Sequence, residues 1–394
     1  MYDVVIIGGG LSGLMASIWL ADRGKKTALI SKGDPMCCLS TGCIDVFGGT
    51  SSPLKGIEKP PRGHPYHFVG LEGIRDSLNF FKKIMAGSGL NYIGDIETNR
   101  GILTPLGTIK ATCLVPQTMK AAYTGDNEYI HIVSFKGLKD FYPAYITSKN
   151  ENAGYSVFDA GISTTVGLAT RFEDTTFRRE FVAKLKSWEI PNGRIAMPAV
   201  LGLSSSVEIM EAISNELDRK IFEIPTLPPS IPGIRLFRRL KYTLQQKGGD
   251  IYWGRDIASV ERSDTQIEAV TIVTGSRPTR VEGRAFVLAT GSFVSGGLYA
   301  LRESVYETVF NLPVVFPKKR AKWFNEDFFD IGHPIEKAGI RVDRSFRPRH
   351  ANLENLFVCG SILAFSNIMK YRCGNGMAIA TGVAAAKSLD RWLG

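Results

Sequence analysis

The chain has 394 residues, of which 44% are hydrophobic and 22% charged, with 41 glycines and a formal net charge of +10. This length and hydrophobic content suffice for a large core and predict two interleaved domains. The positive charge is scattered and accompanies no recognised nucleic-acid-binding module, which argues against nucleic-acid binding and favours solvated faces or an anionic small substrate. No stretch approaches the roughly 18 apolar residues of a membrane span, and no basic and apolar leader precedes the first predicted strand, so we expect a cytoplasmic protein.

The beginning of the chain predicts a βαβ unit. An apolar, β-branched run at residues 2–7 is followed by Gly8-Gly9-Gly10-Leu11-Ser12-Gly13, by a helical pattern ending near residues 22–24, and by a second apolar run at residues 27–30. Strand, glycine turn, helix and strand within about thirty residues are what a parallel sheet with a right-handed crossover requires.

The spacing Gly8-x-Gly10-x-x-Gly13 predicts a nucleotide-binding turn in which Ser12 also takes part. We expect Gly8 to make the tight turn, Gly10 to admit a pyrophosphate against the backbone, and Gly13 to let helix and sheet approach closely. The first amides of the helix would then face the anion. The alternative is a glycine turn that serves packing alone.

The end of the second strand lacks the Asp or Glu that normally accepts the ribose hydroxyls of a dinucleotide. Ser31 and Lys32 stand there instead. Because a serine hydroxyl forms a weaker hydrogen bond to the ribose, the phosphate half of the site is better supported than the adenosine half.

The middle of the chain predicts an inserted domain. Residues 48–73 are rich in Gly, Pro, Ser and His and predict an irregular connection. Beyond it we expect helices at 74–85 and 206–217 and strands at 129–134 and 194–197. The proline-rich run 225–233 excludes a regular helix or central strand and is expected to be a stiff crossing between domains.

The last third of the chain is expected to return to the first domain. It predicts a helix at 234–247 and strands at 250–253, 257–262, 268–274 and 284–288. We therefore expect an α/β protein with a Rossmann-like FAD/NAD(P)-binding fold built from both chain ends, residues 1–48 and 234–394. An α/β cap domain at 49–233 would be inserted between them.

Three C-terminal segments are typical of flavoproteins. Ala289-Thr290-Gly291 ends an apolar strand, as in the turn that two-domain flavoproteins place beside the nucleotide, and the run 354–361, ending in Gly360 and Ser361, resembles the strand that reaches the flavin ribityl chain. Cys373-Gly374-Asn375-Gly376-Met377 opens the last helix, whose amides suit the negative charge on the N1–C2 edge of a reduced flavin. A glycine turn before a surface helix is the alternative.

Six cysteines in a chain of this kind argue against a disulfide framework; they are Cys37, Cys38, Cys43, Cys113, Cys359 and Cys373. The spacing of the first three matches no zinc or iron–sulfur pattern. We therefore expect no metal, and favour small buried packing over a redox or ligand role.

Several blocks together resemble the B subunit of anaerobic glycerol-3-phosphate dehydrogenase over nearly the whole chain. They lie at residues 8–14, 40–45, 64–66, 104–108, 225–230, 232–236 and 288–297. The proline-rich block and the Gly291-Ser292-Phe293 block are the most specific. By this resemblance, Ser40, Thr41 and Gly42 join the cofactor-binding residues.

The resemblance implies a flavin-dependent subunit that oxidises sn-glycerol 3-phosphate to dihydroxyacetone phosphate, with electrons passed to a quinone. It also implies two partners, the larger catalytic flavoprotein (the A subunit) and an iron–sulfur subunit that holds the complex at the inner face of the cytoplasmic membrane. The family is described with FMN, whereas the glycine turn favours FAD, so both cofactors stay open.

Oxidation at C2 of this substrate needs a base for the hydroxyl and cations for the phosphate. His64 is the candidate proton acceptor, and Arg235 and Arg372 are the candidate phosphate or flavin-anion partners, because they lie in or beside the family blocks. His64 can instead brace its own turn, and either arginine can pair with a carboxylate. A flavin relay that oxidises no substrate itself, and a reductase of the succinate/fumarate class, remain alternatives.

Overall fold

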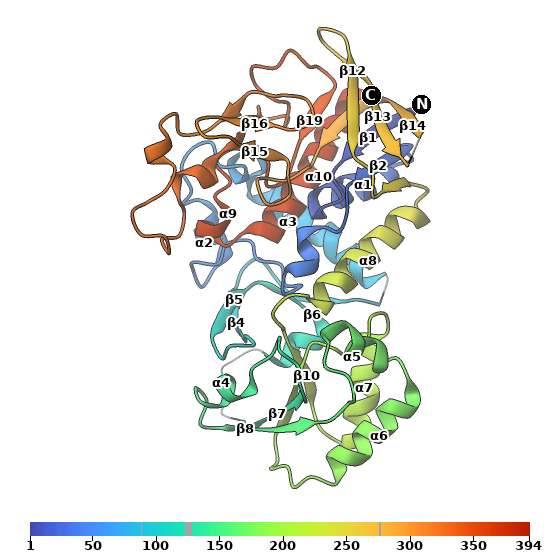
Figure 1. The fold of residues 1–394 in the computed structure, drawn as a ribbon, viewed down its shortest axis with the longest axis vertical. Helices are drawn as coiled ribbons and strands as arrows, with labels where there is room; N and C mark the ends of the chain where they lie inside the picture. The colour runs from blue at the N-terminus through green and yellow to red at the C-terminus, as the bar shows by residue number, and fades with distance from the viewer. Residues whose placement is uncertain (88, 123–127, 276) are drawn as a thin grey trace. The chain divides into compact units, whose positions relative to one another are not determined.

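The computed structural model describes residues 1–87, 89–122, 128–275 and 277–394, which divide into two compact units (Figure 1). Unit 1 comprises Met1–Met36, Asp45–Ile84 and Leu240–Gly394, and unit 2 comprises Cys37–Ile44 and Met85–Arg239. Residues 49–84, which we expected in the inserted domain, thus belong to unit 1. Hydrogen bonds explain this, because Tyr66 Oη donates to the Val46 carbonyl at 2.8 Å and Lys387 Nζ lies 3.3 Å from Asp76 Oδ2.

The central strands of unit 1 form a parallel sheet, as the Rossmann-like pattern predicts. In order these strands are β11 (Asp250–Trp253), β2 (Thr27–Ser31), β1 (Tyr2–Ile7), β14 (Arg277–Leu288) and β19 (Leu356–Val358). The first half of β14 continues into an antiparallel extension with β13 (Ile267–Thr274) and β12 (Ile257–Arg262). Every residue of β2 is buried, as is typical of parallel strands covered on both faces.

Two long helices of unit 1 pack against each other beside this sheet. α1 (Leu11–Ala21) is buried along its whole length. α10 (Gly374–Leu393) approaches it so closely that a side chain on Gly382 would overlap the backbone of Ser12 (Figure 1). The remaining elements of unit 1 are α2 (Pro53–Ile57), α3 (Tyr66–Ala86), β15 (Leu298–Ala300), β16 (Val305–Glu307), β17 (Val314–Val315), β18 (Gly339–Ile340) and α9 (Ile368–Tyr371).

Two sequence-based expectations about helices were wrong. Residues 48–73 are not irregular throughout, because α2 lies within them and α3 begins at Tyr66, with Gly70 (φ 72°) interrupting it. α8 (Ile231–Gln246) begins inside the proline-rich run and crosses the boundary between the units. Pro232 is tolerated there because the first amides of a helix have no partner within it.

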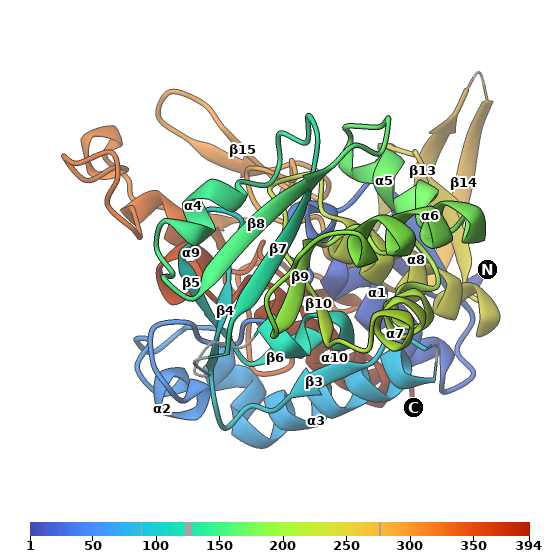
Figure 2. The same cartoon turned by 90° about the horizontal axis from the view of Figure 1, so that it is seen from below.

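Unit 2 is an α/β unit with its own parallel sheet. The strand order is β10 (Ile221–Ile224), β9 (Arg194–Pro198), β7 (Ile130–Phe135) and β8 (Ala153–Phe158) (Figure 2). Phe135, Phe172 and Phe181 pack with ring centroids 5.2–6.1 Å apart in its core. The other elements are β3 (Tyr92–Gly94), β4 (Arg100–Leu103), β5 (Ile109–Thr112), β6 (Leu114–Pro116), α4 (Pro143–Thr147), α5 (Thr165–Arg171), α6 (Thr175–Lys186) and α7 (Ser206–Leu217).

Membrane-spanning helices are not found in the described ranges, where no helix combines sufficient length with sufficient apolarity.

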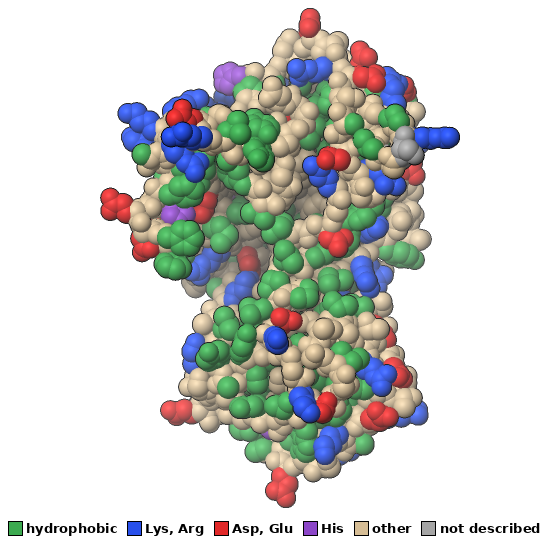
Figure 3. Space-filling view, in the orientation of Figure 1, with side chains coloured by type: hydrophobic (Ala, Val, Ile, Leu, Met, Phe, Trp, Pro, Cys, Tyr) green, Lys and Arg blue, Asp and Glu red, His purple; other side chains and the backbone are tan. Residues whose placement is uncertain are grey.

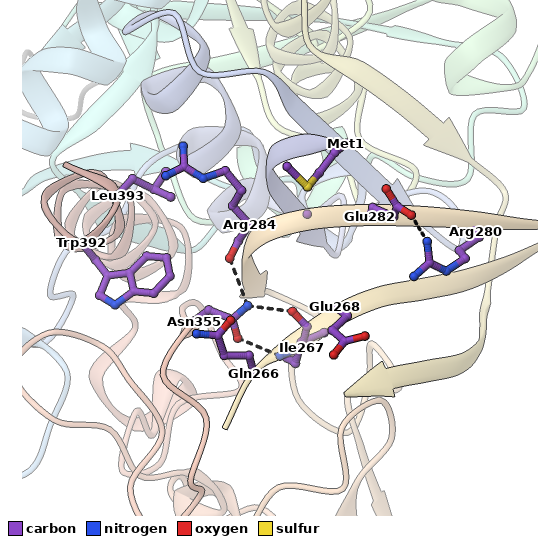
Figure 4. Close-up of a pocket in the computed structure, with 11 residues that line it drawn as sticks. Met1, Gln266, Ile267, Glu268, Arg280, Glu282, Arg284, Asn355, Trp392 and Leu393 are labelled. Carbon is purple, nitrogen blue, oxygen red and sulfur yellow. Dashed lines mark hydrogen bonds and ion pairs between the residues drawn. The ribbon is translucent and has the colours of Figure 1, made fainter. Parts of the chain in front are cut away.

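A surface hollow of about 530 Å³ lies at the antiparallel extension of the unit 1 sheet (Figure 4). Its lining consists of Met1, Gln266, Ile267, Glu268, Arg280, Glu282, Gly283, Arg284, Asn355, Trp392 and Leu393. Arg280 already pairs with Glu282, and Asn355 with backbone groups. The hollow contains none of the site residues predicted from the sequence.

Asn355 joins three strands of unit 1. Its amide nitrogen donates to the carbonyls of Ile267 (2.8 Å) and Arg284 (3.0 Å), and its Oδ1 accepts from the Ile267 amide at 2.9 Å (Figure 4). The residue is 1% exposed, so water cannot replace these bonds.

We predict that Asn355→Ala lowers the free energy of unfolding of unit 1 by about 3 kcal/mol, because buried backbone groups lose their partners. Urea unfolding of the variant and of Glu354→Ala, an exposed neighbour, measures the effect. Equal stability of both variants would contradict the prediction.

Candidate functional site

The glycine turn after β1 is held by close backbone contacts. Gly8 has a φ of 118°, and a side chain on it would overlap the carbonyl of Ala289, the residue that follows β14. A side chain on Gly13 would overlap the carbonyl of Gly8. The fold itself therefore requires glycine at positions 8 and 13.

Gly10 is different from these two glycines. Its φ of −70° and ψ of 175° suit any residue, and a side-chain carbon added to it meets no atom within 4 Å. It precedes α1, whose start has no side-chain cap. Uncapped amides at a helix start, beside open space, form an arrangement that binds phosphate groups.

Two C-terminal segments meet this turn within unit 1. A side chain on Gly360 would overlap Ser12 Oγ, and one on Gly291 would come within 3.4 Å of Ser361 Oγ. The Gly360 amide donates to Thr381 Oγ1 at 3.0 Å. The structure thus brings together Gly8, Gly10, Ser12, Gly13, Thr290, Gly291, Gly360 and Ser361. Thr381 was missed because a buried threonine in a helix carries no distinctive sequence signal.

α10 begins at Gly374, where the sequence predicts it. Cys373 precedes it without a side-chain cap, and the Gly376 amide donates to the Asp45 carbonyl at 3.1 Å. Burial raises the pKa of Cys373, so this residue is a neutral thiol. Asn375 and Met377 lie in the same first turn.

The edge of the sheet beside β2 contains a carboxylate that the sequence analysis missed. Ser31 Oγ donates to the Gly33 carbonyl at 3.1 Å, and Lys32 Nζ lies 2.9 Å from Asp256 Oδ2. Asp256 follows β11, the strand paired with β2. A carboxylate is therefore present near the end of β2, in the loop that follows the neighbouring strand β11, and only the strand order reveals this.

Ser40, Thr41 and Gly42 belong to unit 2, whereas the glycine turn belongs to unit 1. The amide of Gly42 donates to Ser40 Oγ at 3.4 Å, and its carbonyl accepts from Tyr92 Oη at 2.8 Å. Nearby, a hydrogen bond with Cys38 and burial raise the pKa of the Cys37 thiol. Both thiols are buried, in line with a packing role.

His64 has no free ring nitrogen. Nδ1 accepts from the Tyr66 amide at 3.2 Å, so Nε2 carries the proton that it donates to the Ser366 carbonyl at 3.1 Å. The side chain is 0% exposed, and burial lowers its pKa to about 4. This geometry suits a neutral brace between α3 and the segment before α9.

The two candidate arginines have different surroundings. Arg235, in unit 2, is 4% exposed; it pairs with Glu223 at 2.6 and 2.9 Å and donates to the Gly202 carbonyl at 2.8 Å. Arg372, in unit 1, is exposed and forms no ion pair with any described residue. Arg235 therefore matches the expected alternative of pairing with a carboxylate, and Arg372 is available to an anion.

The segment from Phe365 to Arg372 adopts unusual backbone angles. Phe365, Asn367 and Arg372 have φ values of 65°, 40° and 47°, a region that costs energy for residues other than glycine. Both polar side-chain atoms of Asn367 are buried without a partner in the described part of the chain. Strain and unsatisfied polar groups of this kind are typical of functional segments.

We predict that His64 makes the stability of unit 1 depend on pH. The folded pKa of about 4 lies below the ordinary value of 6.5, so the unfolded chain binds the proton more readily. The stabilisation is complete above about pH 6.5 and falls by roughly 3 kcal/mol as the pH drops to about 4.

Denaturant unfolding across this pH range, compared between the native chain and His64→Gln, isolates the contribution of His64. His350→Gln is the control, because His350 is exposed. The prediction fails if the native chain and His64→Gln lose stability in parallel.

Comparisons with known proteins agree with this geometry. A family model described as FAD binding domain matches residues 3–146 and 164–377. The probable B subunit of anaerobic glycerol-3-phosphate dehydrogenase from Halobacterium salinarum is 28% identical over 97% of this chain and 96% of its own length. The B subunit from Pectobacterium atrosepticum is 29% identical over 98% of both.

Among solved structures, 3-ketosteroid-Δ4-(5α)-dehydrogenase from Rhodococcus jostii RHA1 is 11% identical, covers 98% of this chain and 95% of its own, and gives a TM-score of 0.37. The family match covers most of the chain and includes the glycine turn, both C-terminal turns and the start of α10. The chain therefore belongs to the FAD-binding domain family of oxidoreductases, and the predicted resemblance to the B subunit of anaerobic glycerol-3-phosphate dehydrogenase is confirmed.

Proposed function

We propose that this chain is the FAD-carrying subunit of an anaerobic glycerol-3-phosphate dehydrogenase complex, in which sn-glycerol 3-phosphate is oxidised to dihydroxyacetone phosphate and electrons pass to a quinone. The relatives named for this activity match nearly the full length of the chain. The observation that carries the proposal is the glycine at position 10, where neither the backbone angles nor the packing of neighbouring atoms requires a glycine. A pyrophosphate lying against this position accounts for it.

The residues of unit 1 fit FAD better than FMN. The open space at Gly10 and the uncapped start of α1 suit a pyrophosphate, which FMN lacks. Ser31 and Asp256 supply polar groups at the β2 edge for the adenosine ribose. Thr290, Gly291, Gly360 and Ser361 would hold the ribityl side, and the first turn of α10 the N1–C2 edge of the ring.

Bound flavin would accept a hydride from C2 of the substrate and release electrons toward the next acceptor. Around it, this chain would supply Arg372 as a cation for the phosphate, since Arg372 is exposed and forms no ion pair with described residues. His64 would hold the Ser366 carbonyl, and with it the start of α9, in place.

A second candidate function is a flavin relay, with substrate oxidised on a partner protein. One observation favours it: both ring nitrogens of His64 are occupied, and the Arg235 guanidinium is paired with Glu223. A proton acceptor for the substrate hydroxyl is therefore not evident in His64 as folded.

We predict that Gly10→Ala lowers the stability of the flavin-free chain by no more than about 1 kcal/mol, the cost of alanine at the N-cap of α1. It should weaken flavin binding about tenfold or more, because its methyl group occupies the space of the pyrophosphate. Titration with FAD measures the affinity. Gly13→Ala is the contrasting variant, because its side chain would overlap the Gly8 carbonyl and destabilise the fold. Undiminished FAD binding by Gly10→Ala would remove the main support for the proposal.

The function is tested with the purified full-length chain. Acid release and chromatography are expected to give FAD. Adding glycerol 3-phosphate without oxygen then distinguishes the two candidates: loss of the flavin absorbance in the chain alone indicates substrate oxidation here, whereas loss only in the presence of its partner indicates a relay. A response to succinate or fumarate, but not to glycerol 3-phosphate, would refute both.

A further inference from the structure

Residues 318–333 of unit 1 carry the two most exposed large hydrophobic side chains among the described residues. Phe328 and Phe329 are 82% and 84% exposed, and Phe324 and Ile331 are 53% and 58% exposed. We call these four side chains the aromatic tip. Figures 1 and 2 both show the segment, in dark orange, extending away from the unit 1 sheet, and Figure 3 shows hydrophobic side chains at this place with charged groups around them.

The aromatic tip stands on a folded base. Trp323 is 1% exposed, its indole donates to the Pro317 carbonyl at 2.8 Å, and the Arg320 guanidinium lies 4.2 Å from its ring centroid. His333 accepts from the Asn325 amide at 3.1 Å and donates to the Phe328 carbonyl at 3.2 Å. Because the backbone is held in this way, binding through the tip would lose little conformational entropy.

The segment carries charges of both signs in different places. Its cations, Lys318, Lys319, Arg320 and Lys322, lie at the base, where Lys318 lies over the Phe316 ring and Arg320 over the Trp323 ring, whereas the charges next to Phe328 and Phe329 are acidic. Glu326, Asp327 and Asp330 flank Phe328 and Phe329, and these three carboxylates are exposed and form no ion pair with another described residue. Inserting the two rings into a bilayer would carry these carboxylates toward the lipid tails and the anionic head groups, which is costly. A protein surface can offer an apolar pocket and cations to match them.

The base of the segment also contacts the candidate site. Gly332 packs so closely on α9 that a side-chain carbon added to it would come within 3.0 Å of Lys370 Cδ and 3.4 Å of Asn367 Oδ1. α9 lies between Asn367 and Arg372. The base of the aromatic tip therefore packs on the helix that directly precedes the exposed Arg372.

We propose that the aromatic tip is the docking site for another protein of the complex, which receives it in an apolar pocket with a basic rim. This inference rests on the proposed function, because it assigns one surface of the chain to the assembly of the complex. Aromatic side chains that insert into such pockets commonly dominate the affinity of an interface.

The test uses the full-length chain, tagged and purified from its own cells together with the partner it retains. We expect a second polypeptide in constant ratio, with slower amide exchange at residues 324–331 in the complex than in the chain alone. The double variant Phe328→Ser/Phe329→Ser should lower the affinity for this second polypeptide on the order of thirtyfold. The double variant Glu326→Lys/Asp330→Lys should lower that affinity as well. Leu301→Ser, which alters a side chain 52% exposed elsewhere in unit 1, should not.

Five results would overturn the docking proposal, and four of them concern the chain and its protein partner. The double Phe variant could bind the second polypeptide as tightly as the native chain does, or the native chain could retain no second polypeptide at all. Amide exchange at the tip could already be slow in the chain alone, or the chain could associate with itself in a way that the double Phe variant abolishes. Tip-dependent binding to phosphatidylcholine vesicles containing phosphatidylglycerol would replace the protein partner with lipid. Flavin content is measured separately, so a chain that docks its partner but carries no flavin would refute the proposed function and leave the docking site intact.

Discussion

The close crossing of β1, α1 and the end of β14 is the constraint on which the rest of unit 1 depends. Gly8 fits against the Ala289 carbonyl, and Gly13 fits against the Gly8 carbonyl, because neither carries a side chain. This packing presents the start of α1 without a side-chain cap, next to two turns that come from the last third of the chain. A helix start, which is costly to leave unsatisfied, becomes a place where an anionic group is stabilised.

Hydrogen bonds from His64 and Tyr66 hold the segments next to α3 in unit 1. His64, buried and neutral, links α3 to the Ser366 carbonyl, and Tyr66 links α3 to Val46. These bonds explain why residues 45–84 belong to unit 1 although a domain boundary at residue 48 looked natural from composition. They also hold the segment in which Asn367 and Arg372 take positive φ values, so backbone strain there is balanced by contacts elsewhere.

Local patterns predicted much of unit 1 from the sequence, because its βαβ start and the strands near its end depend on neighbouring residues. The side chains with long-range partners could not be predicted. Arg235 and Arg372 both lie in or near family blocks, yet only the fold shows that Glu223 is paired with the first and that no described carboxylate pairs with the second. Asp256 likewise becomes a counterpart of Ser31 only when β11 is placed beside β2.

The four-residue helix α9 connects these features. It begins after Asn367, the neighbour of Ser366, whose carbonyl accepts a hydrogen bond from His64. It ends before Arg372, which leads into the first turn of α10. Within it, Lys370 packs against Gly332 at the base of the aromatic tip. So short a helix has little stability of its own, and its position must come from these neighbours. The contacts of His64 and Gly332, which come from distant parts of the sequence, therefore decide where Arg372 is presented.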